Sequence, residues 1–239
     1  MRTPLAVLLI GAATLAASGC GGAGRDTSAT HATQSSQKQA IAIPPSQSAP
    51  VTLVAGVPYF TSRFHPRLTV TLPHGGWQTG TPETTDSVSF RLLDGPARNA
   101  FVSLVRPTEI ADPVAGARTA ADGKPVPVDF IAWLQRHPRL TAGKPVTVEV
   151  GGMRGRQIDV TVRSAPARRP AECGRHACLP LYFDGKVPVE FAVGDRLRYL
   201  ELRGAGRPLL VELSVGPGSQ FSTVLPRLEA VLKGIRLSG

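Results

Sequence analysis

The chain contains three cysteines, Cys20, Cys173 and Cys178, whose thiol side chains are the most reactive groups in the sequence. A thiolate can be acylated, can pair in a disulfide or can ligate a metal ion. Cys20 follows a short apolar segment and a run of small residues close to the N-terminus. Cys173 and Cys178 enclose the segment Gly-Arg-His-Ala, which contains His176. The surroundings of each cysteine decide which of these reactions is expected.

The segment before Cys20 has the three parts of an export signal. Arg2 supplies a positive end, an apolar core runs from Leu5 to Leu15, and small residues lead to Cys20. The core has the length of a signal peptide and is too short to span a bilayer. We therefore expect export of the rest of the chain.

The small residues before Cys20 resemble the lipobox of bacterial lipoproteins. The resemblance implies that residues 1–19 are a lipoprotein signal peptide and that cleavage occurs before Cys20. It also implies thioether diacylation of the Cys20 sulfur, with palmitate-type chains, which anchors the protein to the extracytoplasmic face of the cell membrane. The alternative is an ordinary secretory signal, cut after Ser18 or Gly19, that leaves a free Cys20 thiol.

The other two cysteines are expected to pair. An exported protein lies in an oxidising compartment, so we predict a Cys173–Cys178 disulfide that shapes one surface loop. A redox pair or a metal site that uses His176 are the alternatives. Redox dithiols usually have a C-x-x-C spacing at a helix N-terminus, and a zinc site needs further ligands that this segment lacks. We expect no metal ion and no cofactor.

The chain is strongly basic, with a formal net charge of +10. Arginine far outnumbers lysine, a bias typical of GC-rich genomes, so a solvated arginine-rich surface is one interpretation. Outside the cell, such a surface can also attract anionic lipids or anionic wall polymers through forces that salt screens. The sequence contains no recognition helix or aromatic-basic stacking motif, so we do not expect nucleic acid as a partner.

Motifs of the common hydrolases are absent from the sequence: there is no G-x-S-x-G elbow, no H-E-x-x-H and no P-loop. His65 and His74 flank one predicted strand, and Glu149 and Asp159 lie on adjacent strands of a predicted hairpin. Each pair could meet, but exposed turns and the solvent faces of strands are the simpler positions for these residues. We therefore expect no enzymatic activity.

A change in composition divides the chain. Residues 20–50 are rich in small and polar residues and lack aromatic residues, so we predict that they form a flexible linker after the lipidated cysteine. Residues 51–239 are long enough to bury one sizeable core and contain neither a second linker nor a repeat. We predict a single extracytoplasmic α+β domain over 51–239.

Alternation of apolar and polar residues predicts most of the strands: 68–72, 87–92, 101–105, 146–150, 157–162, 187–193, 196–203 and 209–215. Gly151-Gly152 predicts a tight hairpin between the fourth and fifth of these. The last three are expected to form an antiparallel meander. Trp77 is expected in the core.

Two helices are predicted. The first covers 129–137, with Asp129 at its positively polarised start and Pro138 limiting its end. The second is C-terminal, with Ser219 or Ser222 as its cap. Its apolar residues are spaced by four and three and predict one continuous buried stripe: Phe221, Leu225, Leu228, Leu232 and Ile235.

This layout resembles the PsbP-like α/β sandwich, in particular the LpqN-type lipoproteins of actinobacteria. The resemblance depends on Leu72-Pro73 followed by Gly76-Trp77, on the Gly151-Gly152 hairpin and on the final helix. It implies an antiparallel sheet with helices packed on it. It also implies a binding or assembly module without catalytic residues.

The first hypothesis for function is therefore a membrane-anchored, non-enzymatic binding or assembly module of the cell envelope, present as a monomer. Its expected contact surface for an envelope protein or an anionic polymer is the loop 164–180, which carries Arg168, Arg169, Arg175 and His176. The alternative is a carrier whose apolar cavity holds a lipid or a small molecule, which a cavity of several hundred Å³ would favour.

Overall fold

The computed structural model describes residues 39–44, 49–94, 100–113, 122–166, 177–204, 207–215 and 220–238. Residues Lys38–Gly239 form one compact unit. Within the described ranges, no helix is both long enough and apolar enough to cross a membrane. Strands predominate over helices, which agrees with an α+β domain built mainly from antiparallel sheet.

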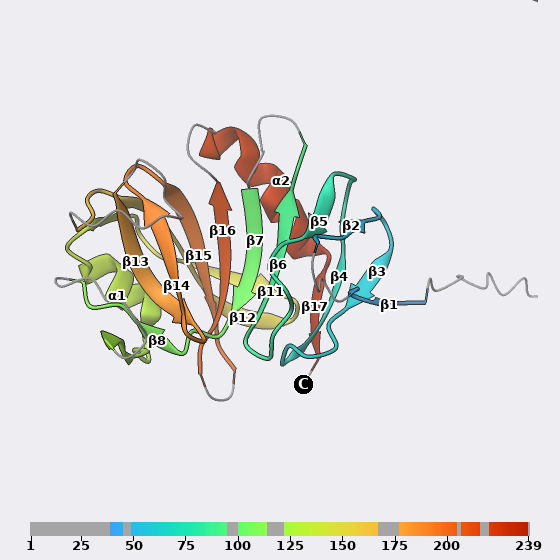
Figure 1. Cartoon of the computed structure of the whole chain (residues 1–239), viewed down its shortest axis with the longest axis horizontal. Helices are drawn as coiled ribbons and strands as arrows, with labels where there is room; N and C mark the ends of the chain where they lie inside the picture. Colours follow the sequence, from blue (N-terminus) through green and yellow to red (C-terminus); the bar gives the residue numbers. More distant parts are fainter. Residues whose placement is uncertain are drawn as a thin grey trace, which may run out of the picture. The chain divides into compact units, whose positions relative to one another are not determined.

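The described part of the chain forms one large antiparallel sheet of nine strands in the order β10-β12-β15-β16-β7-β6-β5-β2, with β11 paired to β12. Its strands β16, β7 and β6 lie side by side (Figure 1). The bounds are β2 Thr52–Leu53, β5 Trp77–Thr79, β6 Ser87–Leu92, β7 Ala100–Val105, β10 Leu140–Ala142, β11 Val146–Val150, β12 Met153–Val162, β15 Arg196–Leu202 and β16 Leu209–Val215.

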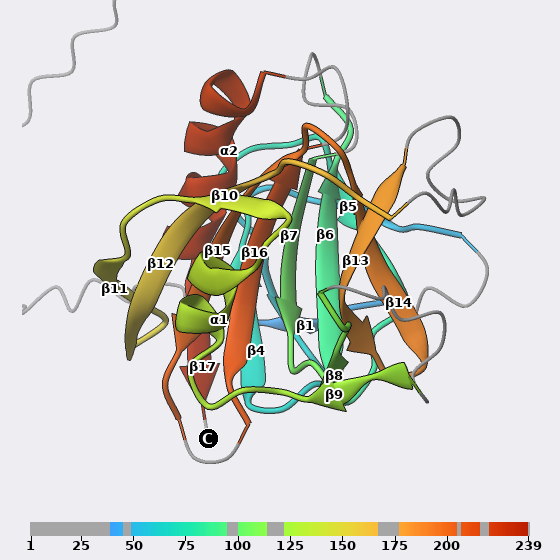
Figure 2. The ribbon, with the colours of Figure 1, turned by 90° about the vertical axis from the view of Figure 1, so that its left-hand side faces the viewer.

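Two smaller sheets flank the large one. The first has the order β1-β3-β4-β17, and its β1–β3 pair is parallel. The second has the order β14-β13-β8-β9 (Figure 2). Their strands are β1 Ile41–Ala42, β3 Pro58–Phe60, β4 Arg67–Thr71, β8 Glu109–Ile110, β9 Lys124–Pro125, β13 Cys178–Asp184, β14 Val187–Ala192 and β17 Ile235–Ser238.

The predicted hairpin is confirmed. Val150 pairs with Met153, and Gly151 and Gly152 both have positive φ, at 60° and 85°. Positive φ at both central residues is what a two-residue turn between right-twisted strands requires, and glycine adopts it without steric cost.

The predicted meander is wrong in one strand. β15 and β16 pair as expected, but β14 pairs with β13 and belongs to a different sheet. The prediction had no strand for β14 to join, because the segment of β13 contains Pro180 and follows a stretch of sequence rich in proline and arginine. Pro180 faces Glu190 at a position where the register of the pair shifts, and β strands accommodate proline at such irregularities.

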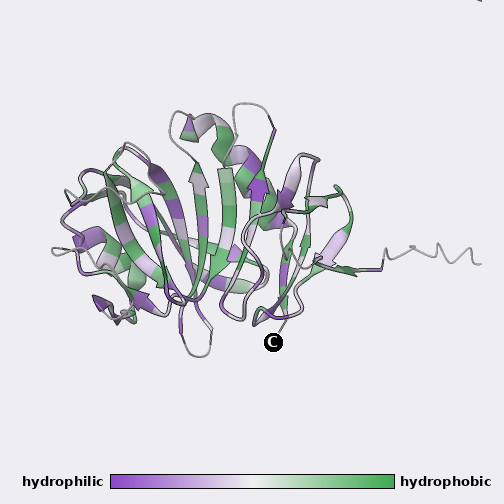
Figure 3. Cartoon of the chain, viewed as in Figure 1, coloured by the Kyte–Doolittle hydropathy of each residue, from purple (hydrophilic) through white to green (hydrophobic). Residues whose placement is uncertain are grey.

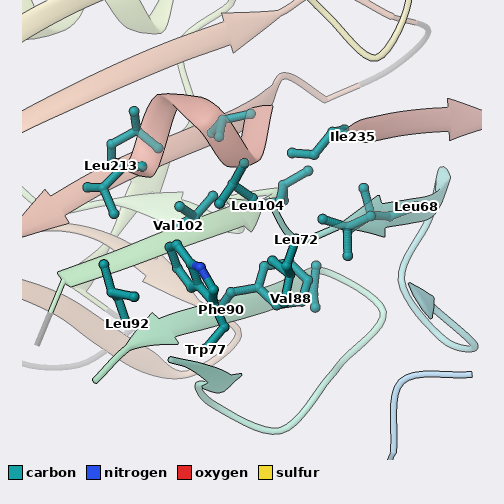
Figure 4. Packing of buried hydrophobic residues seen from close by; sticks show 14 of the residues in the cluster. Leu68, Leu72, Trp77, Val88, Phe90, Leu92, Val102, Leu104, Leu213 and Ile235 are labelled. Atoms are coloured by element: carbon teal, nitrogen blue, oxygen red, sulfur yellow. The ribbon is translucent and has the colours of Figure 1, made fainter. Parts of the chain in front are cut away.

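The first core lies between one face of the large sheet, the β1-β3-β4-β17 sheet and helix α2 (Phe221–Lys233). Figure 4 shows Trp77 and Phe90 packed among aliphatic residues from several strands, and Trp77 is fully buried, as predicted. Figure 3 shows that apolar residues make up most of β7 and β16.

The predicted stripe of the last helix needs correction. The fully buried residues of α2 are Phe221, Val224, Leu228 and Val231, while Leu225 and Leu232 are only partly buried. Gln220 is the N-cap and makes no side-chain capping bond. The helix ends at Gly234, so Ile235 is already in β17, where it pairs with Val70 of β4. The apolar spacing of the helix extended to Ile235 because β17 packs against the same core as α2.

The second core lies on the opposite face of the large sheet. Helix α1 (Phe130–Arg136) covers part of this face, and Asp129 caps it by accepting a hydrogen bond from the Ala132 backbone N–H at 2.7 Å. This confirms the predicted helix and the place of Asp129. The carboxylate of Glu201 accepts the Phe130 backbone N–H and binds Arg156, both at 2.9 Å, which fixes the start of α1 to β15.

The start of the folded unit is earlier than predicted. Residues 20–50 were expected to be linker, yet β1 pairs with β3 and the Ile43 backbone N–H donates to Phe60 O at 2.8 Å. Ile43 is only 4% exposed. A single short apolar cluster in a polar segment was enough to add a strand, because the edge of β3 offered it unpaired backbone groups.

Candidate functional site

Strand β16 contains an unusual residue for its position. All seven residues of Leu209–Val215 are buried, because both faces of this central strand are covered. Val211, Leu213 and Val215 belong to the first core and Leu210 to the second. Glu212 lies on the same face as Leu210 and is 4% exposed. A carboxylate is rarely buried so completely without a specific partner.

Glu212 belongs to a row of polar residues that crosses four strands. Ser89 pairs with Ser103, Ser103 with Glu212, and Glu212 with Tyr199. Residues that are directly opposite in neighbouring strands point to the same side of a sheet. The register therefore places two serines, a carboxyl group and a phenol side by side on the face opposite α2.

Two tyrosines hold the Glu212 carboxyl group in place. The hydroxyl of Tyr182, from β13, donates to Glu212 Oε2 at 2.7 Å, and that of Tyr199 donates at 3.1 Å. Both phenol rings are buried and meet edge to face, with centroids 6.5 Å apart. The carboxyl group thus joins the large sheet to the β14-β13-β8-β9 sheet.

Burial controls the protonation of this cluster. Desolvation raises the pKa of Glu212 above its usual 4.5, although hydrogen bonds from Tyr182, Tyr199 and Ser214 act in the opposite direction. The pKa of each tyrosine is raised well above 10, first by burial and then by the nearby Glu212 charge. The phenols therefore stay protonated and serve as donors to Glu212.

A pocket of ≈ 430 Å³ opens beside this cluster, between the large sheet and the β13–β14 pair. Its floor comes from β6, β7 and β16, and its opposite wall from β13, β14 and the turn after β14. Serine hydroxyls and Glu212 supply polar groups, whereas Phe101, Val105, Val189 and Phe191 supply apolar surface. This volume and mixed lining are typical of sites for small molecules.

A second hollow, of ≈ 590 Å³, lies along Val126–Asp129 and Glu201–Gly204. Its carboxylates already have partners, since Asp129 and Glu201 both bind Arg156. The pocket beside Glu212 lies between two sheets and has both polar and apolar walls, so we take it as the candidate binding site.

Most of the predicted site residues lie outside the described residues: Cys20, Cys173, Arg168, Arg169, Arg175 and His176. Cys178 is buried at the start of β13 and takes part in a disulfide bond. Its pairing with Cys173 stays a prediction. The predicted exposed loop 164–180 is wrong at its end, because residues 178–180 already belong to β13 and are buried.

The two residue pairs considered for catalysis do not form. Glu149 is opposite Arg154 in the hairpin, with which it forms an ion pair, so it does not face Asp159. Asp159 binds the guanidinium of Arg198 through both of its oxygens, at 2.6 and 2.8 Å.

The histidine pair is also separate. His74 lies against the Trp77 ring, at 5.7 Å between centroids, whereas His65 is exposed at the other end of β4. Across the described part of the chain, no three His, Cys, Asp or Glu side chains are grouped so that they could hold a metal ion.

Sequence reasoning raised a cavity as an alternative but missed its location and Glu212. The available signal for Glu212 was its position as the one charged residue of the mainly apolar strand Leu209–Val215. Tyr182 gave no signal, because no strand was predicted there and the first residues of β13 fell in the predicted loop 164–180.

No family model and no curated protein matches the chain. Among solved structures, the chain is similar to the solution structure of cyanobacterial PsbP (CyanoP) from Synechocystis sp. PCC 6803. The two are 16% identical, the TM-score is 0.33, and the match covers 72% of this chain and 86% of that chain. This likeness concerns the PsbP-like fold alone.

Proposed function

We propose that this protein is a lipid-anchored binding protein of the cell envelope that holds a small molecule in the pocket beside Glu212. It is non-enzymatic and has a PsbP-like sandwich domain, and Cys20 carries the anchor on the extracytoplasmic face of the membrane. The observation that carries the proposal is the pocket of ≈ 430 Å³ with a buried carboxyl group on its floor that accepts hydrogen bonds from Tyr182, Tyr199 and Ser214.

The arrangement of the pocket supports binding. Its floor consists of paired strands, and Tyr182 and Tyr199 fix the Glu212 carboxyl group before a ligand arrives. A site that is ordered in advance loses less entropy when it binds, so more of the contact energy contributes to affinity.

The lining gives little support for catalysis. Its described residues include no His, Lys or Cys, so its serine hydroxyls have no base of the usual kind to activate them. Ser89 has a structural role, since its hydroxyl accepts a hydrogen bond from the Thr81 backbone N–H at 2.8 Å. We therefore favour a carrier over a hydrolase.

The partner surface expected from the sequence has no comparable support. Arg168, Arg169, Arg175 and His176 lie outside the described residues, and an interaction with an envelope protein or an anionic polymer remains a prediction. The pocket favours the carrier hypothesis over the assembly module.

Native mass spectrometry of the full-length protein tests this proposal. The protein is extracted from cell envelopes in mild detergent, and bound molecules are released with organic solvent and identified. We expect a small-molecule adduct on the wild-type protein. The variant Ser103→Phe, which places an aromatic ring on the pocket floor between Ser89 and Glu212, is expected to lose it.

The matched control is Thr147→Phe, which adds the same ring at an exposed position of β11. This variant is expected to keep the adduct. A wild-type protein without any bound molecule, or equal occupancy in both variants, contradicts the proposal.

A further inference from the structure

The Glu212 carboxyl group has its hydrogen-bond partners within the protein. It accepts from Tyr182, Tyr199 and Ser214, so three donors surround a side chain that is only 4% exposed. Burial raises its pKa, which favours the uncharged form of the carboxyl group. Glu212 is therefore not a free counter-ion for a charged ligand.

The other carboxylates of the lining do not provide a counter-ion either. Asp195 accepts the Ala192 backbone N–H at 2.8 Å, and Glu190 has an interaction partner of its own within the protein. Asp184 is the last residue of β13 and is half-buried, so it keeps contact with water. An ion pair with a solvated carboxylate contributes little to binding. Among the described residues, the lining contains no Lys, Arg or His, so an anion also lacks a counter-ion.

One hydroxyl group on the floor of the pocket differs from the others. The lining hydroxyls that interact with another side chain belong to Thr81, Ser87, Ser89 and Ser214. Ser103 lies between Ser89 and Glu212 in the row that crosses the strands, and it is half-buried. Within the described part of the chain, the Ser103 hydroxyl has no hydrogen-bond partner. A serine hydroxyl can donate one hydrogen bond and accept two, so Ser103 can bind a ligand oxygen as donor or as acceptor.

The rest of the lining is largely apolar. Phe101 and Val105 come from β7, Val215 comes from β16, and Val189 and Phe191 come from β14. An apolar body gains free energy when it leaves water for such surroundings. A charged group that makes the same transfer loses its hydration, and this cost is large unless a partner compensates it. The lining therefore favours a ligand without charge.

We infer that the pocket selects an uncharged small molecule with an apolar body and one hydroxyl or carbonyl oxygen, and that Ser103 binds this oxygen. This inference rests on the proposed function and specifies its ligand class. The apolar body packs between Phe101 on the floor and Phe191 on the opposite wall. Ser103 distinguishes the ligand from a plain hydrocarbon, and the described lining offers amines and carboxylates no free counter-ion.

Four probes that share a naphthalene ring test the inference: naphthylethanol, naphthylethylamine, naphthylacetate and ethylnaphthalene. Their binding to the full-length protein is measured by equilibrium dialysis at pH 7, against a blank that contains the same detergent. A hydrogen bond between neutral groups adds a modest factor, so the alcohol is expected to bind about two- to tenfold tighter than ethylnaphthalene. The amine and the acetate are charged at this pH and are expected to bind at least about tenfold more weakly than the alcohol.

Two variants of Ser103 locate the effect. Ser103→Ala removes the hydroxyl and is expected to lower the affinity for the alcohol about two- to tenfold, to that for ethylnaphthalene, without weakening ethylnaphthalene itself. Ser103→Thr keeps a hydroxyl and is expected to keep the preference for the alcohol. The control is Thr147→Val, which removes a hydroxyl at an exposed position of β11 and is expected to change nothing.

The native adduct provides an independent readout, because the released molecule should be uncharged at pH 7 and should carry a hydroxyl or carbonyl oxygen. The inference is refuted, and the carrier function stands, if that molecule is an amine or a carboxylate. The same holds if a charged probe binds as tightly as the alcohol, or if Ser103→Ala keeps the preference for the alcohol. If none of the probes binds, the chemistry of the native adduct decides. If the wild-type protein carries no adduct at all, the carrier function itself is refuted.

Discussion

Replacing Glu212 with Gln should make the protein more stable at neutral pH and should leave its stability in acid almost unchanged. Burial raises the pKa of Glu212 above 4.5 in the folded state, whereas the unfolded chain leaves it at its usual value. The folded state therefore binds the proton more tightly. The stability that this proton contributes is fully present below pH 4.5 and is lost as the pH rises through the folded pKa. A glutamine imitates the protonated side chain at every pH.

The size of the effect follows from linkage. One titrating group changes the free energy of unfolding by at most about 1.36 kcal/mol per pH unit, and only between its unfolded and folded pKa values. The difference in stability between Glu212→Gln and the wild type should therefore be close to zero below pH 4.5. It should grow with up to this slope above pH 4.5 and reach a plateau once the pH exceeds the folded pKa.

Urea unfolding of the purified protein measures this difference, with tryptophan fluorescence as the signal. Trp77 is fully buried, so its emission reports loss of the first core. Curves are recorded in half-unit steps of pH through the acidic and neutral range. The control Glu149→Gln changes an exposed carboxyl group, and its difference from the wild type should not vary with pH beyond about 0.5 kcal/mol.

Two results refute this reasoning. A difference that stays flat across the range means that burial does not raise the pKa of Glu212. A wild-type protein that gains stability over Glu212→Gln as the pH rises means that the hydrogen bonds from Tyr182 and Tyr199 outweigh desolvation, so that the carboxylate is the preferred form.

Three further predictions concern the anchor, the cysteine pair and the end of α2. Cys20→Ser should release the folded protein from the membrane; a protein that still sediments with membranes contradicts the anchor. Cys173→Ser should reduce the free energy of unfolding by about 2 kcal/mol in chemical denaturation and keep the fold, and complete unfolding would show that the bridge matters more than we expect. Gly234→Ala should destabilise by about 1–3 kcal/mol, because the added Cβ would lie 2.1 Å from the backbone oxygen of Thr71 in β4. Gly75→Ala, where nothing lies within 4 Å of that atom, is the control and should stay within about 1 kcal/mol of the wild type.

The sequence correctly predicted the elements whose boundaries are set by neighbouring residues, such as regular strands, glycine turns and helix caps. Strand β6 has the predicted bounds, Ser87–Leu92, because its alternation is regular and turns limit it. The β11–β12 hairpin followed from two adjacent glycines. Asp129 marked the start of α1 through the capping bond that a side-chain carboxylate makes there.

The predictions that failed depend on contacts between residues that are far apart in the sequence. The pairing of β14 with β13 depends on a strand that was not predicted, because its first residues fell in the predicted loop 164–180, and no local signal connects the two strands. β16 is covered on both faces, so alternation could not distinguish Glu212 from an exposed residue. The candidate pocket combines three strands of one sheet with two of another, which only the tertiary structure brings together.

A crystal structure of the protein purified directly from its native envelope would test the central claim most directly. We predict a small molecule in the pocket between β7, β16 and β14, with an oxygen within hydrogen-bond distance of the Ser103 hydroxyl. A pocket filled by the protein's own side chains, or one that holds only water, would contradict the account.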